Sequence, residues 1–219
     1  MSRKTSIAAQ FAVSVMLATT GCAGFHSSQD ATQVYTLDPP ASGTAAHGSF
    51  AGGATSGATS GAASSAVTLQ VLRPLVAPGL DTDRIALTRV AQRMDYYAAS
   101  RWPAPLPDLL QTLAIDSLRA AGKYRSVQSD AAAFAADEVL QIEVRRCQAE
   151  YAGDDAHAGA PIVHVQLVAT VGRRSDHALL ASVSADSARA ANENRLQSVV
   201  TAFARAVDDA LGQIAAQLP

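Results

Sequence analysis

The stretch Val163-His-Val-Gln-Leu-Val-Ala-Thr-Val171 has an apolar residue at every second position. Residues 140–144 and 179–183 have the same spacing on either side of it in the chain. A period of two is typical of a strand that buries one face. Because the connections between these three runs are short, we expect an antiparallel meander with one face in the core.

Two further segments have apolar residues at the spacing of one helical face. Residues 106–121 form the first, in which Pro107 suits the first turn and Asp108 suits the positive end of the helix dipole. Gly122 then suits a C-terminal cap, and residues 196–218 form the second, longer helix. The sequence therefore predicts an α+β fold of two layers, in which two helices pack on one face of a mostly antiparallel sheet.

Shorter strands are predicted on either side of the first helix. Residues 67–71 alternate apolar and polar side chains and are followed by Pro74, which ends the run. Residues 85–87 and 94–96 are close enough in the chain to pair as a hairpin. Residues 124–127 follow the helix as a further short strand.

The first residues of the chain have the pattern of a bacterial secretion signal. Arg3 and Lys4 precede an apolar run over residues 7–18, which is too short to span a bilayer because a span takes roughly 20 apolar residues. Thr20-Gly21-Cys22 resembles a lipobox, although Thr19 stands where that pattern prefers a leucine-like residue. We expect a lipoprotein signal; an ordinary signal peptide with an incidental cysteine is the alternative.

Cys22 is the expected site of lipid attachment. In lipoproteins this cysteine becomes the N-terminus and carries a diacylglycerol and an N-acyl chain, and two or more chains hold a protein durably on a membrane. We expect no other cofactor and no metal. Ala23, rather than an aspartate, follows the cysteine, which in bacterial lipoproteins fits export to the outer membrane. The predicted location is the periplasmic face of the outer membrane.

Composition divides the chain into three parts. Residues 1–21 are the predicted signal peptide, and residues 22–66 are the lipidated N-terminus followed by a linker rich in Ala, Gly and Ser. With few side chains to bury, such a linker is expected to be flexible. A short extended segment at residues 34–37 lies within it, and the sequence leaves open whether this segment docks on the core. Residues 67–219 are the predicted folded domain.

The charge and the cysteines exclude some classes of function. The formal net charge is −2, and loss of residues 1–21 removes two cations and no acid, which leaves −4. With aromatics at only 5% and no basic patch, nucleic-acid binding is not expected. Cys147 is predicted on the polar side of its strand, beside Glu143 and Arg145, as a spare thiol; an intermolecular disulfide is the alternative.

The residues that could support catalysis are scattered. The five histidines are dispersed, and none has the spacing of a metal-binding pair. Asp154, Asp155 and His157 share a Gly-rich loop and are expected to be solvated, and His164 is expected on an exposed strand face. We therefore predict that the protein is not an enzyme.

The block from residue 73 to residue 110 carries the most specific pattern. It contains Pro78-Gly-Leu-Asp-Thr-Asp-Arg-Ile85, then Tyr96 and Trp102 ahead of the first helix, and Tyr35-Thr-Leu37 lies upstream. This ordered combination resembles the ABC-type transport auxiliary lipoprotein family, the group that includes paraquat-inducible protein C. The resemblance covers roughly residues 34–40 and 67–215.

The resemblance implies a role in transport between membranes. Members accompany an ABC permease, its ATPase and a membrane-anchored substrate-binding protein of the MCE type, which handle lipids or other hydrophobic compounds. The expected role is non-catalytic docking to this system from the outer membrane, with a homo-oligomer left open. The alternatives are a direct lipid carrier with a pocket between sheet and helices, and a lipoprotein that activates a cell-wall synthase.

The same block supplies the candidate partner-binding residues. They are Leu80, Asp81, Asp83, Arg84, Tyr96, Arg101 and Trp102. Each also has a structural interpretation: Pro78-Gly79 predicts a turn, and Asp81 and Asp83 are expected to cap backbone amides in it. Tyr96 and Trp102 are expected to pack where the sheet meets the first helix.

Overall fold

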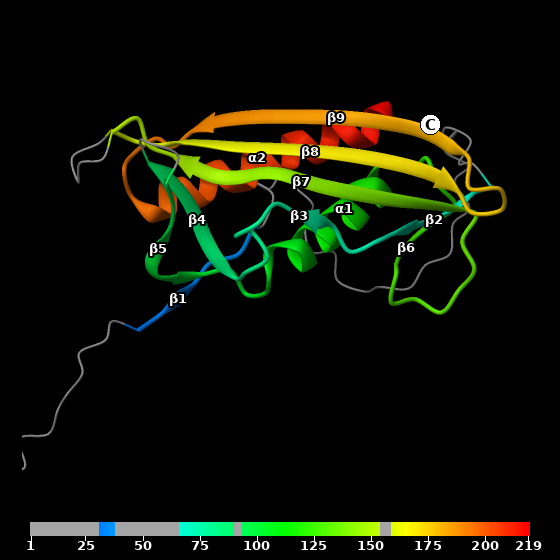
Figure 1. The fold of residues 1–219 in the computed structure, drawn as a ribbon, viewed down its shortest axis with the longest axis horizontal. Coiled ribbons are helices and arrows are strands. Elements are labelled where there is room, and N and C mark those ends of the chain that lie inside the picture. Colours follow the sequence, from blue (N-terminus) through cyan, green and yellow to red (C-terminus); the bar gives the residue numbers. More distant parts are fainter. Residues whose placement is uncertain (1–30, 38–65, 90–92, 154–158) are drawn as a thin grey trace, which may run out of the picture. The chain divides into compact units, whose positions relative to one another are not determined.

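The computed structural model describes residues 31–37, 66–89, 93–153 and 159–219 (Figure 1). The predicted signal peptide, Cys22 and the loop residues Asp154, Asp155 and His157 lie outside these ranges. The described residues form nine strands and two helices. The elements are β1 (Gln33–Val34), β2 (Thr68–Val71), β3 (Leu75–Val76), β4 (Arg84–Arg89), β5 (Arg93–Arg101), α1 (Leu106–Ala121), β6 (Ser126–Ser129), β7 (Glu138–Glu150), β8 (Ile162–Arg173), β9 (Leu179–Ala190) and α2 (Leu196–Gln217).

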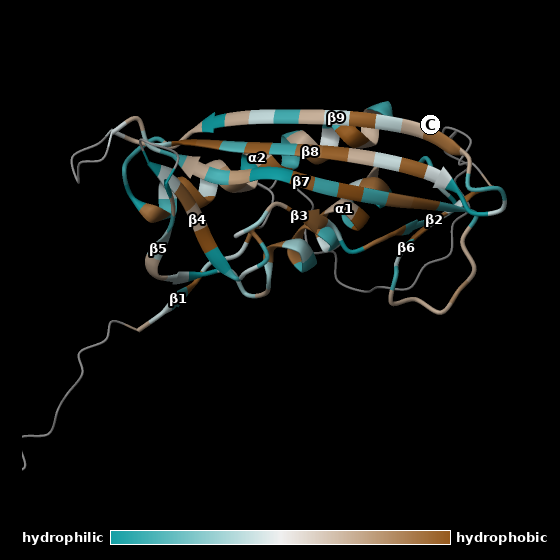
Figure 2. Ribbon diagram, viewed as in Figure 1, coloured by the Kyte–Doolittle hydropathy of each residue, from teal (hydrophilic) through white to brown (hydrophobic). Residues whose placement is uncertain are grey.

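The predicted meander is confirmed. β7 pairs antiparallel with β8, and β8 pairs antiparallel with β9, over almost the full length of each strand. The alternating apolar residues of β8, from Val163 to Val171, are fully buried. Figure 2 shows the same alternation as bands of contrasting hydropathy along β8. These long ladders make the sheet mostly antiparallel, as the sequence predicted.

The other edge of β7 is lined by three short strands in succession. β2, β3 and β4 each run parallel to β7, with Leu69 opposite Glu138, Leu75 opposite Glu143 and Leu87 opposite Ala149. β6 pairs parallel with the outer side of β2. The predicted hairpin is confirmed, since β4 and β5 pair antiparallel. β2, β3 and β4 therefore pair in turn with the beginning, the middle and the end of β7.

An irregularity in β7 changes the side on which its later residues point. The pairing with β8 shifts register between Val144 and Arg146, as a β-bulge does when two residues oppose one. The even-numbered residues are buried before the bulge, and Cys147 and Ala149 are buried after it. The prediction that Cys147 lies on the polar face is therefore wrong: its side chain is 2% exposed.

Both helices lie against the same face of the sheet (Figure 1). In α1, Pro107 occupies the first turn, and Gly122 has φ 67° and donates its N–H to the carbonyl of Arg119, which confirms the predicted cap. α2 packs on β8 and β9 with a continuous buried face. Leu218, just beyond the last helical residue, remains 1% exposed. The two-layer α+β architecture is therefore as predicted.

Two local predictions need correction. The strand expected at residues 124–127 begins at Ser126, because Tyr124 precedes the ladder with β2. Leu179 is 66% exposed rather than buried, because the pairing of β8 with β9 shifts register beside Gly172 at this end. Trp102 is buried, and its ring meets that of Phe203 in α2 edge to face, at 5.5 Å between ring centroids.

The extended segment upstream of the linker docks on the core. β1 pairs parallel with the end of β5, with Val34 opposite Arg101, and the N–H of Tyr35 donates to the carbonyl of Arg101 at 2.9 Å. Leu37 is only 5% exposed and belongs to the hydrophobic core. Burial of this leucine answers the question that the sequence left open.

Candidate functional site

Most of the candidate partner-binding residues gather where the β4–β5 hairpin meets the Pro78-Gly79 turn. We call this the hairpin-base surface; its residues are Asp81, Asp83, Arg84, Tyr96 and Arg101. Gly79 has φ 87°, a backbone conformation that residues with a Cβ rarely adopt, and it receives a hydrogen bond from the Tyr96 hydroxyl at 2.8 Å. The turn and the hairpin are therefore held together through Tyr96, which lies at this surface.

Charged side chains cover this surface in pairs. The guanidinium of Arg84 lies over the ring of Tyr96, 4.0 Å from its centroid, which is cation–π geometry. Arg101 lies 3.7 Å from Asp83 across the two hairpin strands, and Arg84 and Arg101 are opposite each other in the ladder. Two cations and a carboxylate are thus presented beside an aromatic ring.

Arg73, which follows β2, connects this surface to α1. Its Nη2 donates to Asp81 at 2.9 Å and its Nε donates to Asp108 at 2.6 Å, and these carboxylates raise the pKa of the guanidinium further. The contacts that the structure gives to Asp81 and Asp83 are with arginines, so the prediction that they cap backbone amides is wrong. Ion pairs to Arg73 and Arg101 fix the turn instead.

Asp130, directly after β6, contacts the loop that follows β2. It accepts hydrogen bonds from the Gln111 amide at 2.8 Å and from the Arg73 backbone N–H at 3.2 Å, and the Gln111 bond is the main reason that the pKa of Asp130 is lowered. This carboxylate therefore ties β6, α1 and the loop after β2 together. Its role is structural, and no pattern in the sequence indicates it.

Two of the candidate residues are buried. Leu80 is 1% exposed and Trp102 is 2% exposed, so neither has appreciable surface to offer a partner. The backbone N–H of Trp102 donates to the carbonyl of Asp83 at 2.7 Å, which places the tryptophan directly beneath the hairpin base. These two residues support the surface and do not form it.

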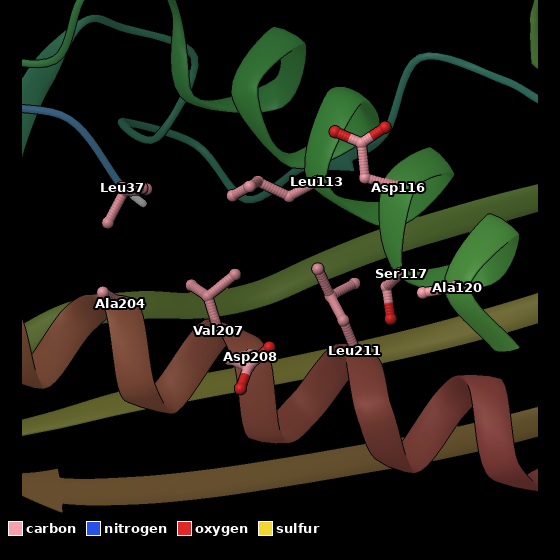
Figure 3. Close-up of a pocket in the computed structure, with 9 residues that line it drawn as sticks. All are labelled: Leu37, Leu113, Asp116, Ser117, Ala120, Ala204, Val207, Asp208 and Leu211. Carbon is pink, nitrogen blue, oxygen red and sulfur yellow. The ribbon is translucent and has the colours of Figure 1, made fainter. Parts of the chain in front are cut away.

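A concave feature also lies between the two helices. It is an apolar groove of about 360 Å³. Its lining residues are Leu37, Leu113, Asp116, Ser117, Ala120, Ala204, Val207, Asp208 and Leu211. Figure 3 shows the side chains of Val207 and Leu211 rising from α2 toward α1, with Leu37 beside them. This groove was not predicted from the sequence, because Leu113, Val207 and Leu211 were assigned only to the helix faces that pack on the sheet.

Among the residues that the structure describes, no three His, Cys, Asp or Glu side chains gather closely enough to hold a metal. Burial raises the pKa of the Cys147 thiol to about 12, which keeps it protonated and unreactive at neutral pH. His164 is partly exposed, as predicted, with its Nε2 3.7 Å from Glu150.

The protein is thus a two-layer α+β domain with a charged surface and an apolar groove. Protein XCC0632 from Xanthomonas campestris has this fold, with a TM-score of 0.62 and 24% identity over 69% of this chain and 82% of that one. An uncharacterized protein of known structure is also similar, with a TM-score of 0.55 and 14% identity over 69% of this chain and 91% of the other. At these identities the likeness shows the fold alone.

Residues 52–215 match the model of a family described as the ABC-type transport auxiliary lipoprotein component. The chain belongs to this family, as the sequence resemblance suggested. No curated protein matches it closely enough to add a more specific description. Within the described residues, no helix has the length and apolar character that a membrane span requires.

Proposed function

We propose that this protein is an outer-membrane lipoprotein, anchored through acyl chains on Cys22, that docks to an MCE-linked ABC transport system in the periplasm. The system would move lipids or other hydrophobic compounds between the two membranes. Its partners in this proposal are the MCE-type substrate-binding protein, the ABC permease and the ATPase bound to that permease. The domain contributes contacts and no catalysis.

Membership of the transport auxiliary lipoprotein family is the observation that carries this proposal. The hairpin-base surface supports it with chemistry suited to a protein partner, since exposed arginine, carboxylate and tyrosine side chains are common at the edges of interfaces. Arg84 and Arg101 are held in place by Tyr96 and Asp83, so the surface is ordered before a partner binds.

Docking of β1 limits the distance between the domain and the membrane. Nine residues lie between Cys22 and Thr32, the first residue of the folded unit, and the ten steps from one to the other span at most about 36 Å. The proposed contact with the transport system therefore takes place close to the outer membrane. A homo-oligomer formed around the end of a periplasmic conduit is compatible with this short tether.

Purification of the tagged full chain from mildly crosslinked membranes tests this proposal. We expect mass spectrometry to recover MCE-type and permease subunits with the wild-type chain. Cys22→Ser should abolish both membrane association and this recovery, while the purified variant keeps the circular dichroism spectrum of the folded domain. Recovery of cell-wall synthases without any MCE or permease subunit would support the synthase-activator alternative and overturn the proposal.

The lipid-carrier alternative is favoured by one observation, the apolar groove between α1 and α2. The pocket that this alternative expected between sheet and helices is occupied by buried side chains such as Trp102, Phe203 and Leu167. Lipid extraction and mass spectrometry of the purified Cys22→Ser chain distinguishes the two roles. We expect no lipid at a stoichiometric level, and one lipid per chain would establish the carrier.

A further inference from the structure

We propose that the groove between α1 and α2 receives an amphipathic helix of a partner protein. In this arrangement the apolar face of the helix packs on Leu113 and Ala120, the more accessible apolar residues of the lining. Lys or Arg side chains on its two flanks reach Asp116 and Asp208. The inference deepens the proposed docking function and rests on it, because the helix belongs to a protein with which the domain docks.

The apolar part of the groove has a rigid floor. Val207 and Leu211 are 2% and 4% exposed and belong to the hydrophobic core, so the sheet beneath them fixes their positions. Leu113 on α1 and Leu37 from the N-terminal segment form the opposite wall. A groove between two packed helices presents rows of side chains into which the ridges of a third helix fit. This is the geometry in which amphipathic helices bind hydrophobic grooves.

The size of the groove favours side chains over a whole lipid. Its volume of about 360 Å³ is near the lower end of the range, roughly 300–1,000 Å³, that encloses a drug-sized molecule. It is also partly open to the solvent rather than enclosed. A few apolar side chains of a helix would fill it, whereas a lipid with two acyl chains would remain largely exposed.

Charge decides which helix fits. Asp116 lies on α1 and Asp208 on α2, so a carboxylate borders the groove on each side. Asp208 has no ion pair within the described part of the chain. Arg119 lies 3.6 Å from Asp116, but its Nε and Nη2 donate to the carbonyl of Val127 on β6, which holds the guanidinium toward β6. Two carboxylates repel phosphate and fatty-acid headgroups and attract cations, so a partner with basic flanks is complementary.

Photo-crosslinking of the full chain in its own membrane tests the inference. A photoreactive phenylalanine analogue is placed at Ala120, an exposed groove residue, and the captured peptide is sequenced by mass spectrometry. We expect a helical peptide of another protein with apolar residues at i, i+3, i+4 and i+7 and Lys or Arg beside them.

Charge reversal supplies the matched comparison. Asp116→Arg together with Asp208→Arg should lower the crosslinking yield by about tenfold, the effect of about 1.4 kcal/mol of lost affinity. Asp186→Arg makes one such charge reversal at an exposed position on β9 and should leave the yield unchanged. All three aspartates are at the surface, so the variants are expected to fold, which circular dichroism verifies.

Several outcomes overturn the inference. They are capture of phospholipid, of a second copy of this chain or of its own residues 38–65, and a yield that the double charge reversal does not change. Co-purification from membranes distinguishes failure of the groove assignment from failure of the proposed function. If MCE-type subunits still co-purify, only the groove assignment is wrong. If the captured helix belongs to a cell-wall synthase, the groove assignment stands and the proposed transport role fails.

Discussion

The part of the chain from β7 to α2 and the part from β1 to β5 are built in different ways. β7, β8 and β9 are long, antiparallel and joined in sequence order, and α2 covers them with an unbroken buried face. The earlier part consists of short strands that pair with distant partners, and β5 is exposed at most of its residues. β2 and the centre of β4 are buried, and both strands pair with β7, whereas ion pairs lie only around the turn and the hairpin base.

This difference separates stability from recognition. Burial of apolar surface supplies most of the folding free energy, and the second part of the chain contains most of the long buried strands. The first part presents the hairpin-base surface, where contacts are exposed and individually weak. We therefore expect mutations in the two parts to have distinct consequences: loss of folding in one, and loss of partner contacts with a folded domain in the other.

The largest effect is expected from Phe203→Ala, in the core that both parts share. Phe203 is 1% exposed and its ring meets that of Trp102 edge to face. Its truncation should reduce the free energy of unfolding by about 3–5 kcal/mol, because it leaves a cavity as well as removing buried surface. Urea denaturation of the soluble chain from residue 23 onward measures this. Tyr96→Ala is the comparison, and an equal loss there would contradict the division between the two parts.

Gly79→Ala should have the next largest effect, within the N-terminal part. Gly79 has φ 87°, and a Cβ there would lie 2.7 Å from the Met94 sulfur. We expect a loss of about 1–2 kcal/mol from the left-handed backbone alone. Gly212→Ala is the matched control, since it lies in α2 with open space around it and should stabilise the helix by about 0.5–1 kcal/mol. Equal effects of the two substitutions would show that the turn is not strained.

The pH dependence of the folding stability tests whether Cys147 is buried, as the bulge in β7 requires. Burial raises its pKa from 9.0 to about 12, so the unfolded chain loses this proton near pH 9 while the folded chain keeps it. The stabilisation is therefore complete below pH 9 and is lost as the pH rises toward 12. Relative to Cys147→Ala, the wild type should lose about 1.4 kcal/mol by about pH 10. Rapid alkylation of the native protein at neutral pH would instead place the thiol at the surface.

The smallest effect is expected from Arg73→Met, which removes the ion pairs between the loop after β2, the turn and α1. All three side chains are more than 40% exposed, so solvent screens their interaction. The loss should be about 0.2–1 kcal/mol at low salt and should shrink in about 1 M NaCl. Chemical denaturation at the two salt concentrations measures it. A loss that does not depend on salt would assign Arg73 a packing role instead.

Local patterns in the sequence were sufficient to predict the second part of the chain. The strands near residues 140, 163 and 179 and both helices follow from spacing alone, because each element pairs or packs with its neighbour in the chain. The bulge at Arg145 was missed, although the apolar positions shift from even to odd numbers across the adjacent Arg145 and Arg146. Cys147 was therefore assigned to the wrong face.

The first part of the chain was harder to predict because its partners are distant in sequence. Nothing in residues 68–76 states that they run parallel to β7, and nothing in residues 33–37 states that they pair beside Arg101. The candidate surface was predicted from the family pattern. That pattern contains both Asp83 and Arg101 but does not indicate that they form an ion pair. The burial of Leu80 and Trp102 and the groove between the helices both required the three-dimensional structure.

Photo-crosslinking from one exposed position in each part tests the central claim most directly. A photoreactive side chain at Ala98 probes the region of the hairpin-base surface, and one at Ser184 probes the open face of the meander. We predict that position 98 captures an MCE-type or permease subunit in cells and that position 184 does not. Capture of these subunits from position 184 and not from position 98 would contradict the account.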